Sequence, residues 1–255
     1  MKLGNACAVI TGGASGLGLA VARRVVEAGG RATMLDIQQD AGDAAAGTLG
    51  GAAAFTQCDV TDEVAMETAV RAAAARMGGL TLAVACAGVA TPGKLLGRDG
   101  PMAAAVFQRV LTINTVGTFN LGRIAADLMQ HNAPEAGEER GLIVHTASVA
   151  AYDGQIGQVA YAASKAAVAG MVLPMARELA RYGIRVMGIA PGLFATPMLA
   201  GLPQEAQDSL ATQVPFPSRL GKPAEFADLV AALYGNPMLN GEVIRLDGAI
   251  RMQPK

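Results

Sequence analysis

A glycine-rich segment near the start of the chain is the feature that most constrains its fold. It reads Thr11-Gly12-Gly13-Ala14-Ser15-Gly16-Leu17-Gly18 and lies between a short apolar run, Ala6–Thr11, and an amphipathic stretch, Leu17–Ala28. The run predicts a buried strand and the stretch a helix. Glycines at such a junction allow a tight turn and close approach of a pyrophosphate, which the helix N-terminus favours. The segment, with GxxxGxG spacing, predicts a dinucleotide-binding turn whose candidate contacts are Gly12, Ser15, Gly16, Leu17 and Gly18.

Strand and helix patterns alternate along the rest of the chain, which predicts a parallel sheet covered on both faces. The strand candidates are Ala6–Thr11, Ala32–Asp36, Ala53–Cys58, Leu80–Cys86, Leu142–Ser148, Ile184–Ala190 and Glu242–Asp247. The helical stretches are Leu17–Ala28, Asp62–Met77, Ala103–Gln130, Ala160–Tyr182 and Pro223–Tyr234. A chain of 255 residues, 52% of them apolar, suits one α/β domain. We expect a cofactor half over about 1–140 and a catalytic and substrate half over about 141–255.

Two segments interrupt this alternation. Ala90–Met102 is rich in glycine and proline and predicts a surface loop, to which the sequence assigns no role. Phe194–Phe216 follows a predicted strand and contains several prolines, which predicts a lid loop.

Composition excludes several classes of function. The net charge of −1 offers no basic excess for nucleic acid, and no apolar run approaches the ~18 residues of a membrane helix. Cys7, Cys58 and Cys86 are an odd, sparse set, which is typical of buried thiols in a reducing compartment. His131 and His145 lack metal-ligand spacing, so we expect no metal. The first residues predict a strand, not a signal peptide, and we expect a cytoplasmic protein.

An acidic residue at the end of the second predicted strand indicates the dinucleotide. Asp36 lies 18 residues after Gly18 and precedes Ile37, and no Arg or Lys occurs within Gly12–Gly18. A carboxylate there accepts hydrogen bonds from the adenosine ribose of NAD and repels the 2′-phosphate of NADP. The alternative role of Asp36 is a helix or turn cap. We expect NAD as the cofactor.

Asp59 and Val60 follow the third predicted strand and are candidate adenine contacts. Asp59 is equally suited to capping the helix that starts near Thr61-Asp62. The sequence leaves both roles open.

Four polar residues in the second half form a candidate catalytic set. Tyr161 and Lys165 are four residues apart, so on a helix their side chains share one face. Ser148 ends the fifth predicted strand, where ligands of parallel sheets bind, and Asn114 lies in the helical pattern Val110–Gly122. Each residue alone has an ordinary structural role, as packing residue, solvated side chain or cap. Their recurrence together, downstream of a dinucleotide turn, favours catalysis.

Removal of a hydride from an alcohol also requires a base for the hydroxyl proton. An ammonium ~4 Å from a phenolate, at an effective dielectric of ~20, interacts with it by about 4 kcal/mol. Lys165 is therefore expected to bring the pKa of Tyr161 from about 10 toward neutrality. Ser148 would form a hydrogen bond to the substrate oxygen. Asn114 would bind a water molecule or stabilise a kink of the backbone beside Lys165.

Taken together, these motifs resemble the short-chain dehydrogenase/reductase family over nearly the whole chain. The resemblance implies a Rossmann-like, doubly wound, seven-stranded sheet, commonly assembled as a tetramer. It maps the catalytic tetrad onto Asn114, Ser148, Tyr161 and Lys165. It adds cofactor contacts at Cys86, Ala87, Gly88, Tyr161, Lys165, Pro191, Gly192, Leu193, Phe194 and Thr196. Where the family usually has Asn-Asn-Ala-Gly, this chain has Ala85-Cys86-Ala87-Gly88.

Longer segments, such as HTASVAAYDGQIGQVAYAASK and NGEVIRLDGAIRMQP, resemble members that act on 3-hydroxyacyl-CoA and also accept steroids. The implied reaction is NAD-dependent interconversion of (S)-3-hydroxyacyl-CoA and 3-ketoacyl-CoA. Animal members are mitochondrial, which implies the mitochondrial matrix for a eukaryotic chain. The alternatives are a 17β-hydroxysteroid or other secondary-alcohol dehydrogenase, and a non-catalytic NAD-binding scaffold.

Residues in and near the tetrad are candidate substrate contacts. Ser148 and Tyr161 would hold the reacting oxygen. Gln155 and Gln158 lie just before Tyr161 and would hold a thioester carbonyl; their alternative role is hydrogen bonding at the surface or within the loop. Arg219 and Lys222 are candidates for CoA phosphates by their proximity in sequence alone. We further expect a homotetramer that packs through Asn240–Pro254, with neither nucleic acid nor membrane as a partner.

Overall fold

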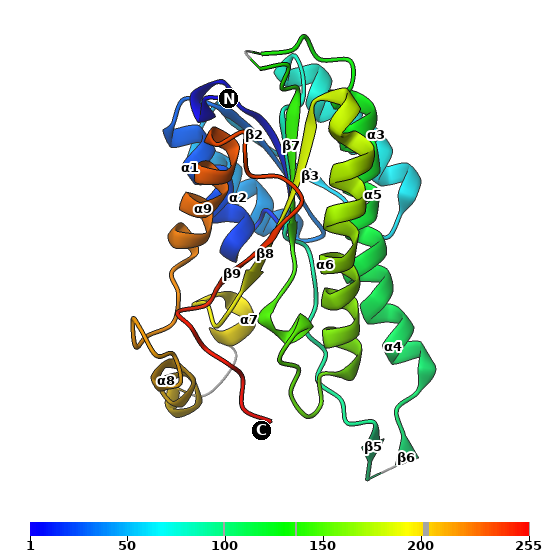
Figure 1. The fold of residues 1–255 in the computed structure, drawn as a ribbon, viewed down its shortest axis with the longest axis vertical. Helices are drawn as coiled ribbons and strands as arrows, with labels where there is room; N and C mark the ends of the chain where they lie inside the picture. Colours follow the sequence, from blue (N-terminus) through cyan, green and yellow to red (C-terminus); the bar gives the residue numbers. More distant parts are fainter. Residues whose placement is uncertain (99, 136, 201–203, 255) are drawn as a thin grey trace.

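Seven parallel strands form one sheet in a computed structural model that describes residues 1–98, 100–135, 137–200 and 204–254 (Figure 1). The strands are β1 (Cys7–Thr11), β2 (Arg31–Asp36), β3 (Ala53–Gln57), β4 (Leu82–Ala85), β7 (Gly141–Thr146), β8 (Ile184–Pro191) and β9 (Val243–Leu246). All seven predicted strands are present, with ends shifted by at most two residues. The predicted Rossmann-like sheet in a single domain is confirmed.

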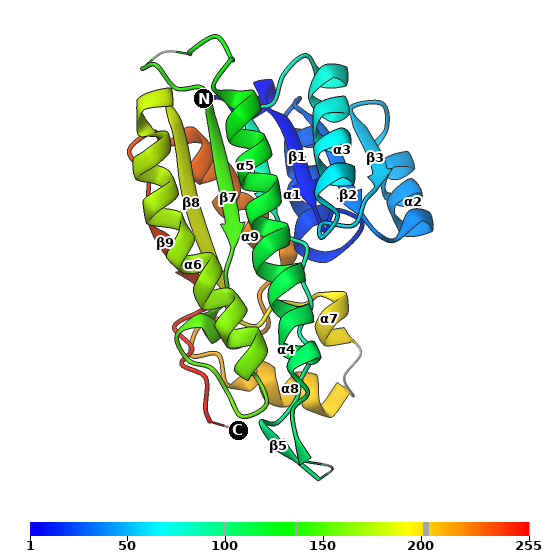
Figure 2. The ribbon, with the colours of Figure 1, turned by 90° about the vertical axis from the view of Figure 1, so that its right-hand side faces the viewer.

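Helices cover both faces of this sheet (Figures 1 and 2). One face is covered by α1 (Gly16–Glu27), α2 (Gln39–Leu49) and α9 (Pro223–Gly235). The other is covered by α3 (Glu63–Met77), α5 (Gly117–Met129) and α6 (Val159–Leu179). Because apolar side chains meet the helices on both faces, β1, β4, β7 and β8 are buried along their whole length.

The strand order places a ligand-binding crevice at one edge of the sheet. The order is β3-β2-β1-β4-β7-β8-β9, so the direction of winding reverses between β1 and β4. Ligands of open α/β sheets bind at such a switch point, beyond the carboxyl ends of the strands. Thr11 and Ala85 are register partners at that end of β1 and β4.

Two helical details differ from the sequence prediction. The helix α2 was not predicted, because its sequence QDAGDAAAGTL lacks large apolar side chains that would mark a buried face. The helix nevertheless packs closely on β3, because Gly42 lies directly against the Phe55 ring. A Cβ added at Gly42 would lie 2.1 Å from that ring, which is too close for a side chain to fit. The predicted helix Ala103–Gln130 is divided into α4 (Ala104–Leu111), a π-helical turn Thr112–Val116 and α5.

The two predicted loops also contain short regular elements. Within Ala90–Met102, β5 (Leu96–Gly97) pairs with β6 (Gly100–Pro101) in a small hairpin, and residue 99 lies outside the described residues. Within Phe194–Phe216 lie α7 (Pro197–Ala200) and α8 (Gln204–Thr212), and residues 201–203 lie outside the described residues. Both segments lie beyond the carboxyl edge of the sheet (Figures 1 and 2).

One helical segment meets the length and composition of a membrane span, which the sequence prediction did not foresee. Val159–Tyr182 has a mean hydropathy of 1.4. It packs along β7, β8 and α4, and its Lys165 side chain is buried against β7. We therefore interpret this apolar segment as a helix that packs against the central sheet (Figure 2).

His145 is the second-last residue of β7 and is completely buried. Its side chain faces α5, where a Cβ added at Gly122 would lie 3.2 Å from its Cε1 atom. Neither ring nitrogen has a hydrogen-bond partner among the described residues. Burial, and secondarily the charge of Lys165, lower the pKa of His145 to about 4. The imidazole is therefore neutral in the folded protein at neutral pH.

This burial predicts a pH-dependent loss of stability. As the pH falls from 6.5 to about 4, the unfolded chain binds a proton at His145 and the folded chain does not. The free energy of unfolding should therefore decrease across that window, by on the order of 3 kcal/mol from this residue. His145→Leu, of similar size, should remove this contribution in urea unfolding measured at a series of pH values. Equal pH dependence in both proteins would contradict it.

Candidate active site

Three elements bring the four predicted catalytic residues to the carboxyl edge of the sheet. Ser148 lies two residues beyond the end of β7, Tyr161 and Lys165 lie one turn apart on α6, and Asn114 lies in the π-helical turn before α5. Asn114, Ser148 and Lys165 are buried. The structure therefore brings the predicted tetrad together.

Lys165 joins α6 to the sheet. Its Nζ donates a hydrogen bond of 2.8 Å to the carbonyl oxygen of Thr146 at the end of β7, and it lies 5.9 Å from the centre of the Tyr161 ring. Burial lowers the pKa of Lys165 to about 8. The ammonium is thus held beside the phenol by one backbone contact.

Tyr161 differs from the sequence expectation in the direction of its pKa. Burial raises the pKa, and a hydrogen bond with Ser148 lowers it by less. The expected lowering of the Tyr161 pKa by Lys165 is not seen, because desolvation by burial opposes formation of the phenolate and is the largest effect on this group. In the protein alone, Tyr161 is a neutral phenol.

Asn114 connects the segment that follows β4 to the helix α6. Its Oδ1 accepts from the Val89 N–H at 2.8 Å, and its Nδ2 donates to the Val89 carbonyl and the Ser164 Oγ, both at 2.9 Å. The Ser164 hydroxyl donates in turn to the Tyr161 carbonyl at 2.7 Å. Asn114 therefore holds the first turn of the catalytic helix rather than pointing to solvent.

Ser164 was not among the predicted site residues. The signal for it is a serine inside a helical pattern, a position that serine disfavours unless its hydroxyl bonds locally. Its side chain is fully buried between Asn114 and Tyr161.

The glycine turn has the close approaches that only glycine allows. Gly12 has a φ of +65°, and a Cβ there would lie 2.7 Å from the backbone nitrogen of Ala87. A Cβ at Gly18 would lie 2.3 Å from the carbonyl oxygen of Gly12. Ser15 occupies the N-cap of α1 but makes no capping hydrogen bond through its side chain. The hydroxyl and the helix N-terminus thus supply donors of the kind that bind a phosphate.

Asp36 is fixed at the end of β2 beside this turn. Its Oδ2 accepts from the Ala14 N–H and its Oδ1 from the Gln38 N–H, both at 3.2 Å. These bonds orient the carboxylate between the glycine turn and the start of α2. They include the turn-capping contact considered above, and a carboxylate held this way retains acceptor capacity for ribose hydroxyls.

The helix-capping role considered for Asp59 is filled by another residue of the described chain. Asp62 is the N-cap, since its Oδ1 accepts from the Val64 and Ala65 N–H groups at 3.0 and 2.9 Å. Asp59 instead accepts from both the N–H and the hydroxyl of Thr61 at 2.8 Å. The Asp59 side chain therefore shapes the turn that follows β3.

The remaining predicted cofactor contacts surround the same crevice. Cys86, Ala87 and Gly88 follow β4, and the Cys86 sulfur lies 3.6 Å from the Thr146 hydroxyl. Pro191 ends β8, followed by Gly192, Leu193 and the buried Phe194. Thr196 lies against the glycine turn, where a Cβ at Gly16 would be 3.5 Å from it.

Three of the predicted substrate contacts, Gln155, Gln158 and Arg219, make hydrogen bonds to other protein groups. Gln155 Nε2 donates to the Gln253 carbonyl at 2.9 Å, and Gln158 exchanges hydrogen bonds of 3.1 and 3.3 Å with Gln155. Arg219 pairs with both carboxylate oxygens of Glu225, at 2.6 and 3.0 Å. These contacts give Arg219 a structural role and weaken the prediction that it binds a CoA phosphate.

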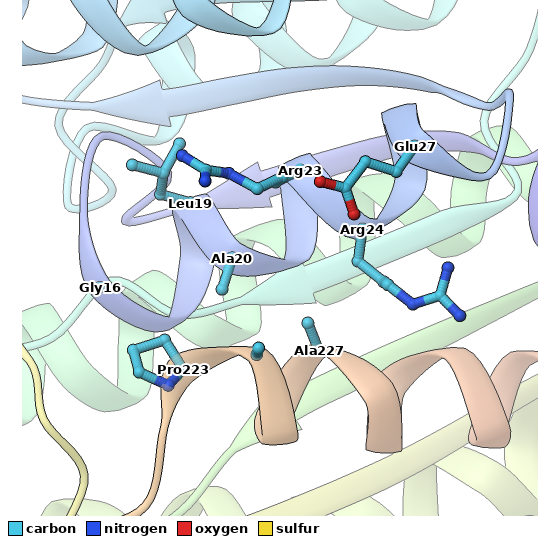
Figure 3. A pocket seen from close by; sticks show the side chains of 9 residues that line it. Gly16, Leu19, Ala20, Arg23, Arg24, Glu27, Pro223 and Ala227 are labelled. Carbon is cyan, nitrogen blue, oxygen red and sulfur yellow. The ribbon is translucent and has the colours of Figure 1, made fainter.

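An open cleft of about 270 Å³ lies outside this crevice, between α1 and α9 (Figure 3). Its lining includes Gly16, Arg23, Arg24 and Pro223. None of the tetrad residues lines it. The cleft therefore lies on the outer side of the helix whose N-terminus faces the crevice.

Fold and site together define an α/β oxidoreductase, and comparison with known proteins gives its family. The chain belongs to the short-chain dehydrogenase family, whose model, described as short chain dehydrogenase, matches residues 6–207. The resemblance inferred from the motifs is confirmed.

Similar proteins extend over nearly the whole chain. The 3-hydroxyacyl-CoA dehydrogenase type-2 of Homo sapiens is 55% identical over 249 residues, covering 97% of this chain and 95% of the human protein. That of Drosophila melanogaster is 52% identical over 252 residues, covering 98% and 99%.

Two solved structures are also similar. A 3-hydroxyacyl-CoA dehydrogenase type-2 from Mycobacterium avium has a TM-score of 0.94 and 42% identity, covering 99% of this chain and 98% of that one. A 7α-hydroxysteroid dehydrogenase, complexed with NADH and 7-oxo glycochenodeoxycholic acid, has a TM-score of 0.88 and 29% identity, covering 100% and 97%.

Proposed function

We propose that this enzyme interconverts (S)-3-hydroxyacyl-CoA and 3-ketoacyl-CoA with NAD as the hydride carrier. The observation that carries the proposal is the convergence of Ser148, Tyr161 and Lys165 beside the glycine turn at the switch point of the sheet. The similarity to proteins named 3-hydroxyacyl-CoA dehydrogenase type-2 supports the substrate class. The S configuration follows from the family resemblance.

The residues of the crevice fit a nicotinamide dinucleotide. The glycine turn and Ser15 offer donors for its pyrophosphate, and Asp36 offers acceptors for the adenosine ribose. Among the described residues, Lys165 donates to the Thr146 carbonyl with one of its three N–H groups. The other donors are available for the ribose attached to the nicotinamide. When bound, such a dinucleotide would supply the hydride acceptor, and its nicotinamide ring would carry a positive charge until the hydride is transferred.

Each tetrad residue then has a defined task. Tyr161 takes the proton from the substrate alcohol, and Lys165 stabilises the resulting phenolate. Ser148 donates a hydrogen bond to the substrate oxygen while its own oxygen accepts from the Ala150 N–H at 3.1 Å. Asn114 keeps the first turn of α6, and so the phenol, in position. A non-catalytic scaffold would have no use for this arrangement.

Removing the phenol hydroxyl tests the catalytic assignment. Tyr161→Phe should lower kcat by roughly 10²- to 10⁴-fold and leave the dissociation constant for NADH nearly unchanged. Lys165→Ala should lower kcat and move the pH optimum upward, because the phenolate loses its neighbouring cation. Retention of most activity in Tyr161→Phe would show the assignment to be wrong.

Asp36 supports a preference for NAD over NADP. The carboxylate lies beside the glycine turn, and the exposed Ile37 that follows offers no positive charge for a 2′-phosphate. Steady-state kcat/KM measured with each cofactor should strongly favour NAD. Asp36→Ala combined with Ile37→Arg should narrow that difference, whereas Asp40→Ala, which removes a charge from the neighbouring helix, should not. Equal use of both cofactors by the wild type would overturn the proposal.

The lid segment supports an acyl or steroid substrate. Phe194–Phe216 is rich in Leu, Ala, Met and Phe, which offers no cation for a small carboxylate. Acetoacetyl-CoA reduction by NADH should be much faster than oxidation of a 17β-hydroxysteroid under matched conditions. A rapid steroid reaction with an inert CoA ester would replace the proposal by the steroid alternative, which the similarity to a 7α-hydroxysteroid dehydrogenase keeps open.

We also propose a homotetramer in a reducing compartment, either the cytoplasm or the mitochondrial matrix. The copies are predicted to pack through Asn240–Pro254. Apolar side chains on the outer helical layer, among them Val116, Phe119 and Leu173, are 44–45% exposed and would be covered by other copies as well. Cys7, Cys58 and Cys86 are all free. A tetramer in light scattering is expected, and a monomer at micromolar concentration would contradict it.

A further inference from the structure

Arg245 on β9 joins the turn that follows its own strand to the segment around Asp153, which is distant in sequence. Its guanidinium donates to Asp153 at 2.6 Å, to Asp247 at 2.7 Å and to the Ile250 carbonyl at 2.9 Å. It also lies 5.5 Å from the centre of the Tyr152 ring. The side chains of Arg245 and Asp153 are 22% and 19% exposed, so the pair is shielded more than a typical surface ion pair.

The segments held by Arg245 continue into a hydrogen-bonded layer. The Ile156 N–H donates to the Pro254 carbonyl at 3.0 Å, and Gln155 Nε2 donates to the Gln253 carbonyl. On the other side, the Gly93 N–H donates to the Gly157 carbonyl at 2.8 Å. We call this layer the rim, defined as Gly93, Tyr152–Gly157 and Ile250–Pro254.

The rim is continuous with the active site. Its central part, Tyr152–Gly157, is the connection between Ser148 and Tyr161. The turn that carries its C-terminal part touches the lid segment, because the Phe216 N–H donates to the Gly248 carbonyl at 3.2 Å. Both views place the C-terminal part beyond the carboxyl edge of the sheet, with α7 and α8 (Figures 1 and 2).

Two observations indicate what the rim contacts. The side-chain amide of Gln155 donates to the Gln253 carbonyl and accepts from Gln158, so both ends of this amide stabilise the layer. The exposed side chains Tyr152 and Ile156 are largely apolar, at 53% and 57% exposure. The side chains of Tyr152 and Ile156 suit an uncharged acyl portion, whereas the exposed Arg251 of the same rim pairs with Asp247 at 3.4 Å.

We propose that the rim is a specificity-determining wall for the acyl portion of the substrate, and that Arg245 is its positioning residue. The proposal rests on the proposed function. Arg245 acts through Asp153 and the tail rather than by touching substrate. Because the wall is held by hydrogen bonds to backbone, it bounds the space available to the acyl chain.

The test compares Arg245→Gln, Asp153→Asn, their double variant and a chain ending at Ile250. Each change should raise KM for acetoacetyl-CoA by roughly 5- to 30-fold, with kcat within about 2-fold and KM for NADH unchanged. The double variant should match the stronger single one, since both substitutions break the same contact. Longer 3-ketoacyl chains should become better substrates relative to acetoacetyl-CoA. Asp228→Asn, which breaks the exposed Arg24–Asp228 pair at 3.0 Å, is the control and should change none of these values.

The contrary results are equally defined. An unchanged KM for acetoacetyl-CoA in folded variants would overturn the proposal, as would parallel changes in kcat and in KM for NADH. If Arg245→Gln fails to fold, Asp153→Asn and the shortened chain decide the outcome. If the wild type turns over only another secondary alcohol, the 3-hydroxyacyl-CoA function fails by itself, and the same KM comparison with that alcohol still tests the rim.

Discussion

The hydrogen bond from Lys165 to the Thr146 carbonyl is the contact on which the site depends. It fixes α6 against the end of β7 at 2.8 Å and places a buried ammonium beside Tyr161. Burying an unpaired charge is costly, so this position is tenable only because acceptors are near and the pKa of Lys165 is lowered to about 8. The same desolvation raises the pKa of Tyr161. The protein therefore holds a phenol and a buried ammonium side by side, where a further positive charge would lower the pKa of Tyr161 strongly.

Much of this arrangement was predictable from sequence. Buried parallel strands are continuous apolar runs, so the seven strands were found in order, and Tyr161 and Lys165 share a helix face by spacing alone. The division of Ala103–Gln130 at a π-helical turn was not predictable, because all of its residues suit an ordinary helix. Ser164 was missed because its role requires Asn114 to lie against α6, a tertiary contact without a sequence period.

Contacts between elements also bear on other predictions. Gln155 was predicted to meet substrate because it is polar and near Tyr161 in sequence, and Arg219 because it is basic and near the lid segment. In the structure Gln253 accepts a hydrogen bond from Gln155 and Glu225 accepts from Arg219, and the contacts of both residues with substrate stay predictions. The pKa of Tyr161 was predicted from charge alone, and desolvation, which sequence does not report, has the opposite sign. Spacing thus identifies which residues meet within one element, whereas contacts between elements decide what their side chains do.

We infer that Tyr161 would act as a base when the positive charge of a bound, oxidised nicotinamide adds to that of Lys165. An ultraviolet difference titration of tyrosine ionisation, comparing the wild type with Tyr161→Phe, measures this pKa without and with saturating NAD. We predict a pKa above the ordinary 10.0 in the protein alone and a marked decrease toward neutrality with NAD bound. A pKa that stays above 10.0 in the NAD complex would contradict the claim.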